Sequence, residues 1–116
     1  MEKSLPQEYE DKKISLKSLN VGGFAWKRED LLHFLKDPRA GVFAVLGGDV
    51  LSYKDGKLSY TYDNWSAPER PTTERFETFC KRSRDEAMRY VNNYPKDEDI
   101  VFAPVITSEV TAGWTS

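Results

Sequence analysis

Apolar residues recur along the chain with two different periods, and these periods predict its secondary structure. From residue 75 to residue 93 they fall at steps of three and four, which is the spacing of an amphipathic helix. Residues 27–36 carry a shorter stripe of the same kind. We expect this second helix to stop at Asp37, because a proline follows and disfavours the α conformation of the residue before it. The pattern therefore predicts one long and one short helix.

Short runs of β-branched and aromatic residues predict the strands. Residues 42–46 are continuously apolar, as in a strand that is buried on both faces. Residues 50–53 and 58–62 flank a Lys-Asp-Gly-Lys turn, and Asp-Gly between two such runs is a strong signal for a β-hairpin. Residues 100–107 form the last run, in which Pro104 indicates an edge or a bulge because proline has no N–H to donate.

The second arm of the predicted hairpin alternates in character. Leu58, Tyr60 and Tyr62 point to one side, and Ser59, Thr61 and Asp63 point to the other. This alternation predicts an antiparallel strand that is half buried.

The order of these elements predicts an α+β fold, with a mainly antiparallel sheet of about four strands and one long and one short helix packed on it. A length of 116 residues fits one domain. We predict a flexible N-terminal segment at residues 1–13, because they are polar, a single α+β domain at residues 14–107, and a C-terminal tail at residues 108–116.

Charge and cysteine content narrow the possible functions. A net charge of −2 argues against a general nucleic-acid binder, which needs an excess of basic residues. No apolar run approaches the roughly 20 residues that cross a bilayer, and the N-terminus lacks the apolar stretch of a signal peptide. Cys80 is the single cysteine, which suits a reducing compartment. We therefore expect a cytoplasmic protein that binds neither nucleic acid nor membrane.

Candidate catalytic groups are few. His33 is the single histidine, with Asp30 and Asp37 about one turn away on each side, and a small hydrolase using His33 and Cys80 is one hypothesis. An exposed histidine and a buried thiol on the apolar side of the long helix are the simpler interpretation. One cysteine and one histidine are too few for a structural zinc site, and we expect no cofactor.

Aromatic and acidic residues gather around the predicted hairpin and the loop after it. Tyrosine and tryptophan dominate the binding energy of many interfaces, and acidic groups steer basic partners. These residues predict a surface for a protein partner, made of Asp49, Tyr53, Asp55, Tyr60, Tyr62, Asp63, Trp65 and Glu69.

The same region carries a family resemblance. In residues 42–65 a strand ends in Gly-Gly-Asp-Val at residues 47–50, a hairpin leads to Tyr62 and Trp65, and a long helix then starts near Phe76. This arrangement resembles the fortieth numbered immunity-protein family of bacterial polymorphic toxin systems.

The similarity extends over roughly residues 24–106, about the length of a domain. The resemblance implies a cytoplasmic protein that neutralises a co-produced toxin by binding it tightly, and it brings no catalytic residues. A generic protein-interaction or regulatory domain is the alternative that the residues leave open.

Overall fold

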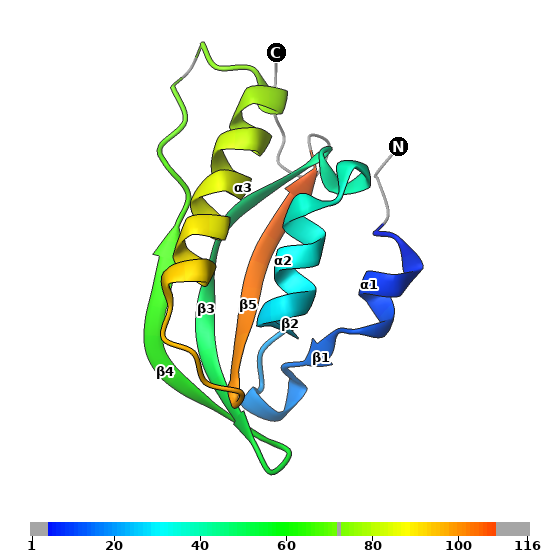
Figure 1. The fold of residues 1–116 in the computed structure, drawn as a ribbon, viewed down its shortest axis with the longest axis vertical. Coiled ribbons are helices and arrows are strands. Elements are labelled where there is room, and N and C mark those ends of the chain that lie inside the picture. Colours follow the sequence, from blue (N-terminus) through cyan, green and yellow to red (C-terminus); the bar gives the residue numbers. More distant parts are fainter. Residues whose placement is uncertain (1–4, 72, 109–116) are drawn as a thin grey trace.

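The computed structural model describes residues 5–71 and 73–108 and confirms the α+β class. Its strands form one open antiparallel sheet in the order β1-β2-β5-β3-β4 (Figure 1). The strands are β1 (Ile14–Ser15), β2 (Phe24–Lys27), β3 (Phe43–Lys54), β4 (Lys57–Ser66) and β5 (Ile100–Ser108). The helices are α1 (Gln7–Asp11), α2 (Arg28–Lys36) and α3 (Phe76–Asn93), with 3-10 turns η1 (Lys17–Leu19) and η2 (Pro38–Ala40).

The sheet differs from the prediction in two ways. It contains a short strand, β2, that the sequence pattern does not predict, and a two-residue strand, β1, where the pattern leaves open an edge strand or a turn of helix. In addition, the runs at residues 42–46 and 50–53 are parts of one strand, β3, which is 12 residues long. The predicted hairpin is confirmed, because β3 and β4 meet at a tight turn in which Asp55 and Gly56 have φ angles of 52° and 77°.

Two glycines let β3 continue where the sequence suggests a break. Leu46 is an extra residue in the pairing of β3 with β5, and Gly47 next to it has a φ of 147°. A Cβ on Gly47 would lie 2.4 Å from the Trp65 carbonyl oxygen, and one on Gly48 would lie 2.3 Å from the Trp65 ring. The two glycines therefore make room for Trp65 of β4 to lie against β3.

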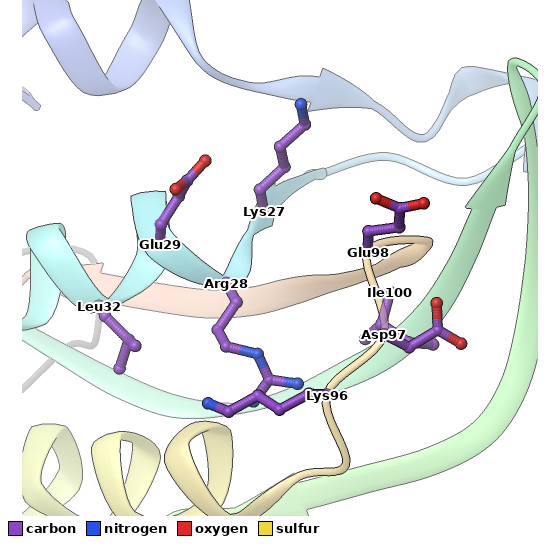
Figure 2. A pocket seen from close by; sticks show the side chains of 8 residues that line it. All are labelled: Lys27, Arg28, Glu29, Leu32, Lys96, Asp97, Glu98 and Ile100. Carbon is purple, nitrogen blue, oxygen red and sulfur yellow. The ribbon is translucent and has the colours of Figure 1, made fainter.

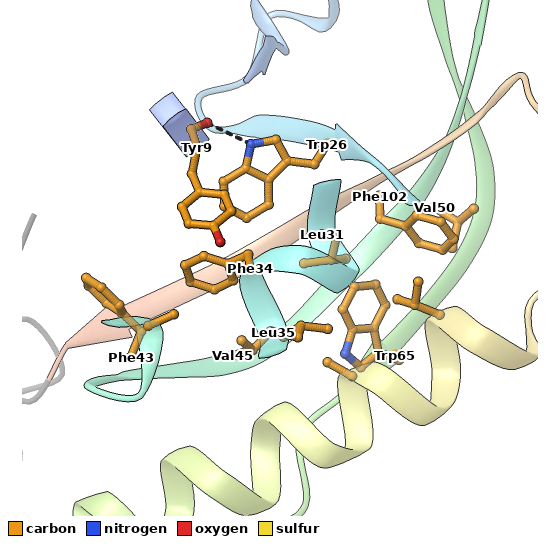
Figure 3. Packing of buried hydrophobic residues seen from close by; sticks show 13 residues of the cluster. Tyr9, Trp26, Leu31, Phe34, Leu35, Phe43, Val45, Val50, Trp65 and Phe102 are labelled. Carbon is orange, nitrogen blue, oxygen red and sulfur yellow. Dashed lines mark hydrogen bonds between the residues drawn. The ribbon is translucent and has the colours of Figure 1, made fainter. Parts of the chain in front are cut away.

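The main core lies between the sheet and the helices. Helices α2 and α3 cross the same face of the sheet (Figure 1). The side chains that pack between these helices and the sheet are aromatic and aliphatic (Figure 3). Trp26, Phe34 and Phe102 are the largest side chains that are fully buried. The rings of Trp26 and Phe34 lie 5.0 Å apart. Burial of such side chains stabilises the fold by roughly 1.5–3 kcal/mol each.

The N-terminal segment takes part in this core. The sequence predicts a flexible segment at residues 1–13, but residues 7–11 form α1 and Tyr9 is buried. The Trp26 Nε1 group donates to the Tyr9 carbonyl oxygen at 3.0 Å (Figure 3), and the Tyr9 ring packs edge-on to Phe34 at 5.4 Å. The Tyr9 hydroxyl donates to Asp37 at 2.6 Å. The domain boundaries themselves stay predictions, and the residues predicted as a tail beyond Ser108 lie outside the described part.

The opposite face of the sheet is only partly covered. Val50 and Phe102 point into the main core, so their strand neighbours Leu51 and Val101 point the other way, where they pack against Leu16 beside η1. Farther along this face, no helix formed by residues 5–71 and 73–108 covers the sheet. We call this uncovered part the open face, and its exposed residues include Leu46, Asp49, Tyr60 and Val105.

Candidate partner-binding surface

A bulge in β4 shapes the open face. Asp49 of β3 pairs with Asn64, and Leu51 pairs with Tyr60. One residue of β3, Val50, therefore lies opposite three residues of β4, which are residues 61–63. We call these three residues the bulge. Such extra residues bend a strand and turn a side chain away from its regular direction.

Hydrogen bonds hold the bulge in place. The Thr61 hydroxyl donates to the Val50 carbonyl oxygen at 2.7 Å and accepts from the Asp63 N–H at 3.1 Å. The Asp63 carboxylate accepts from the Tyr94 hydroxyl at 2.7 Å, which ties the bulge to the end of α3. This hydrogen bond is the main cause that raises the pKa of Tyr94 above its usual value, and burial adds to it. The residues on both sides of Tyr62 are therefore fixed.

Tyr62 itself is in an unusual conformation. Its φ is 70°, a left-handed value that is rare for a bulky residue, and its side chain is 84% exposed. Its ring lies 6.0 Å from the ring of Tyr60, with 30° between the two planes. A left-handed conformation costs roughly 1–2 kcal/mol for a residue other than glycine. Burial of the Tyr62 side chain offsets little of this cost. The hydrogen bonds of its neighbours must therefore hold Tyr62 in the left-handed conformation.

Three of the predicted site residues come together here. Tyr60 lies opposite Leu51, and Asp49 precedes Leu51 by two residues on the same side of β3. Tyr62 lies against Tyr60. The prediction of a half-buried strand is wrong for these tyrosines, because Tyr60 is 44% exposed and Tyr62 more so. Tyr60 faces away from the helices, and the bulge turns Tyr62 outward.

The other predicted residues lie elsewhere. Tyr53 is half buried in the cluster around Leu16. Asp55 is exposed in the hairpin turn, and Glu69 is exposed in the loop after β4. Asp63 belongs to the bulge, but its carboxylate binds Tyr94, whose ring contacts the main core at Phe102.

Trp65 lies in the main core, not on the surface. It is only 7% exposed, and its ring stacks on Tyr90 at 5.1 Å with 24° between the planes. Trp65 therefore lacks the exposed ring that the predicted contact with a partner requires.

Sequence reasoning missed two exposed apolar residues on the open face, Leu46 and Val105. Val105 follows Pro104 in the half of β5 that pairs only with β3, because β5 pairs with β2 at Val101 and Phe102. Alternation along β5 points Val105 away from the helices, so this signal was present in the sequence. Leu46 lies at the irregularity before Gly47, which no sequence pattern places.

The two groups of the hydrolase hypothesis do not form a site. His33 is exposed on α2, whereas Cys80 is fully buried on α3, where it packs with Ala44, Phe76 and Phe79. Among residues 5–71 and 73–108, no three His, Cys, Asp or Glu side chains are grouped as a metal site requires. Within the same residues, no helix combines the length and the apolar character that crossing a bilayer demands.

A second surface feature is a hollow of about 430 Å³ beside the start of α2 (Figure 2). Its charged lining residues are Lys27, Arg28 and Lys96 with Glu29, Asp97 and Glu98. The Arg28 guanidinium donates to the carbonyl oxygens of Val91 and Pro95, so it caps the C-terminal end of α3. Figure 2 shows Lys27 and Glu29 pointing away from Arg28. The charges do not converge, and we assign no ligand to this hollow.

Comparison with known proteins gives one family. The sequence model of a family described as Immunity protein 40 matches residues 15–106, which confirms the resemblance stated above. No curated protein and no solved structure matches the chain significantly.

Proposed function

The chain belongs to the Immunity protein 40 family, and from this we propose that it neutralises a cognate bacterial toxin by binding it directly, without catalysis. The observation that carries the proposal is the family match, which extends over most of the chain, from residue 15 to residue 106. An immunity protein that works by binding needs a stable body and an exposed recognition surface. We propose the cytoplasm as its location, because a chain with one cysteine suits a reducing compartment.

We place the toxin-binding surface on the open face and the bulge. Four of the six large apolar or aromatic side chains that are exposed in the described residues lie there, namely Leu46, Tyr60, Tyr62 and Val105. Exposed apolar side chains that gather on one face are typical of interaction sites. Asp49 and Asn64, which pair across β3 and β4, add polar groups between them. Tyr53, Asp55 and Glu69 remain proposed contacts of the toxin outside the open face and the bulge.

The test uses the catalytically inactivated C-terminal domain of the toxin encoded beside the gene for this chain. We expect the two purified proteins to form a complex in calorimetry, and co-expression of this chain to restore growth of cells that make the active toxin. Val105→Asp places a charge on the open face, and we expect it to weaken binding at least tenfold because an unpaired charge in an interface is costly.

Lys81→Ala is the matched control. It changes the net charge by the same amount, and Lys81 is an exposed residue of α3, on the other side of the sheet. We expect it to bind like the wild type. If the wild-type chain neither binds the toxin nor restores growth, the proposed function is wrong. If Val105→Asp binds like the wild type, the function stands and the open face is the wrong surface.

A further inference from the structure

We infer that Tyr62 is the anchor of the toxin-binding surface, and that with Tyr60 it takes a basic side chain of the toxin, an arginine or a lysine. This inference rests on the function proposed above. It goes further because it names one residue and the chemistry of the group that this residue binds.

The backbone of Tyr62 is in a strained conformation. A bulky residue at a φ of 70° is strained, and such strain persists where the surroundings impose it, often at functional sites. The strain is not explained by packing, because the side chain is 84% exposed. Glycine would adopt this conformation without strain. An aromatic ring at this position therefore points to a requirement outside the fold.

Hydrogen bonds make the backbone around Tyr62 rigid. Thr61 binds both Val50 and the Asp63 N–H, and Asp63 binds Tyr94, so the backbone on each side of Tyr62 is held before any partner arrives. A side chain that is already held in place loses less conformational entropy on binding. Tyrosine also has few rotatable bonds for its contact area. These properties are those of an anchor residue.

The surroundings of the Tyr62 ring suit a cation. The faces of tyrosine rings attract cations, and here two rings lie 6.0 Å apart. Asp49 is exposed on the open face, and Asp63 is the next residue after Tyr62. Neither carboxylate forms an ion pair with a described basic residue. Two π faces on the side of the sheet that carries Asp49 fit a guanidinium or ammonium group, whereas the Asp63 carboxylate is engaged by Tyr94.

The nearest basic residues on the hairpin do not occupy this place. Lys54 and Lys57 pair with each other at the turn. Lys57 precedes Tyr60 by three residues, which is about 10 Å along an extended strand. Among the described residues, cation–π contacts join Lys13 to Phe24 and Arg28 to Phe102, so neither Tyr60 nor Tyr62 already holds a cation of this chain.

The binding test compares three substitutions at one position against the same inactivated toxin domain. Tyr62→Phe keeps the ring face, and we expect it to bind within about twofold of the wild type. Tyr62→Leu keeps an apolar side chain but no π face, and we expect a loss of about tenfold or more. We expect Tyr62→Gly to lose at least as much.

The stability test needs no partner. Because glycine relieves the strain, Tyr62→Gly should raise the melting temperature by about 3–6 °C while binding falls. Asn20→Gly is the matched control, since Asn20 also has a positive φ, of 60°, at the end of η1. Asparagine tolerates this conformation better than tyrosine, so this control should change the melting temperature less and leave binding unchanged.

Four outcomes would overturn the inference. The first is equal binding by Tyr62→Leu and the wild type, which leaves the proposed function intact. The second is an equal loss in Tyr62→Phe and Tyr62→Leu, which would assign the role to the hydroxyl group. The third is a wild-type chain that sediments as a dimer and a Tyr62→Leu variant that is monomeric, because the occupant would then be a second copy of this chain. The fourth, a wild-type chain that does not bind the toxin, removes the proposed function as well.

Discussion

Ser83 joins the long helix to the sheet through a single hydroxyl group. Its Oγ accepts from the Val45 N–H at 3.1 Å and donates to the Cys80 carbonyl oxygen at 3.0 Å. Val45 precedes the part of β3 that pairs with β4, which begins at Gly47, so its N–H needs another partner. Ser83 is fully buried and supplies that partner.

We predict that Ser83→Ala lowers the free energy of unfolding by about 1–3 kcal/mol, because it leaves a buried N–H without an acceptor. Urea denaturation measures this change. Ser59→Ala, at an exposed position of β4, is the control and should change the free energy by less than about 0.5 kcal/mol. A Ser83→Ala variant as stable as the control would show that the Val45 N–H finds another acceptor.

Trp65 shows which features a sequence specifies at this scale and which it does not. The predicted strand ends at residue 62 and leaves Trp65 in the loop after it, whereas β4 continues to Ser66 and Trp65 is buried. Burial depends on Gly47 and Gly48 in the partner strand and on the bulge that precedes it. The alternation of apolar and polar residues along one strand does not show where a neighbouring strand leaves space for a side chain. Tyr62 is similar, because its exposure comes from a change in pairing that no local pattern encodes.

At the scale of elements, length separates the predictable segments from the others. Helix α3 covers residues 76–93, close to the predicted 75–93, because many apolar positions repeat its period. α1, β1 and β2 have five, two and four residues, which is too short for a period to show. Contacts distant in sequence form these elements, such as those of Tyr9 with Trp26 and Asp37.

The link between α1 and η2 predicts a dependence of stability on pH. Burial, followed by the hydrogen bond to Asp37, raises the pKa of Tyr9 from 10.0 to about 12. A group whose pKa is raised by folding stabilises the fold fully below its unfolded pKa. This contribution is lost as the pH rises through the folded value. We therefore expect the free energy of unfolding to fall between pH 10 and pH 12.

Tyr9→Phe keeps the ring and removes the ionisable group, so it should reduce the slope of this fall. It should not abolish the slope, because the pKa values of Tyr90 and Tyr94 are also raised. Denaturation between pH 9 and pH 12 checks the prediction. Tyr53→Phe makes the same chemical change at another tyrosine and serves as the comparison. Equal slopes in the wild type and Tyr9→Phe would contradict a neutral Tyr9 hydroxyl in the folded state.

At the scale of the whole molecule, the two faces of one sheet have different roles. One face, under α2 and α3, carries the main core (Figure 1). On the other face Leu46, Tyr60 and Val105 are exposed, and the bulge lies in the outer strand beside them. The net charge of −2 is small, so attraction to a basic toxin depends on where the acidic groups lie. Asp49 and Asp63 lie at the proposed surface.

We predict that replacing Asp49 and Asp63 by asparagine slows association with the toxin domain severalfold and flattens its dependence on salt. Steering acts on the association rate and is screened by ions. Asparagine still offers Tyr94 an acceptor, so the bulge should persist. Stopped-flow mixing at several ionic strengths measures the rates. Replacing Asp85 and Glu86 of α3 by their amides is the control with the same change in charge. An unchanged salt dependence in the first pair would exclude steering by these groups.

The bulge also affects how copies of the chain meet at high concentration. β4 is the outermost strand, and a straight outer strand offers a row of unpaired N–H and C=O groups on which another chain can add. The extra residues interrupt that row, and at the opposite border β1 is only two residues long. The β4 border of the sheet therefore resists growth by strand addition. The same irregularity that presents a tyrosine thus makes this edge a poor template for a strand of another copy.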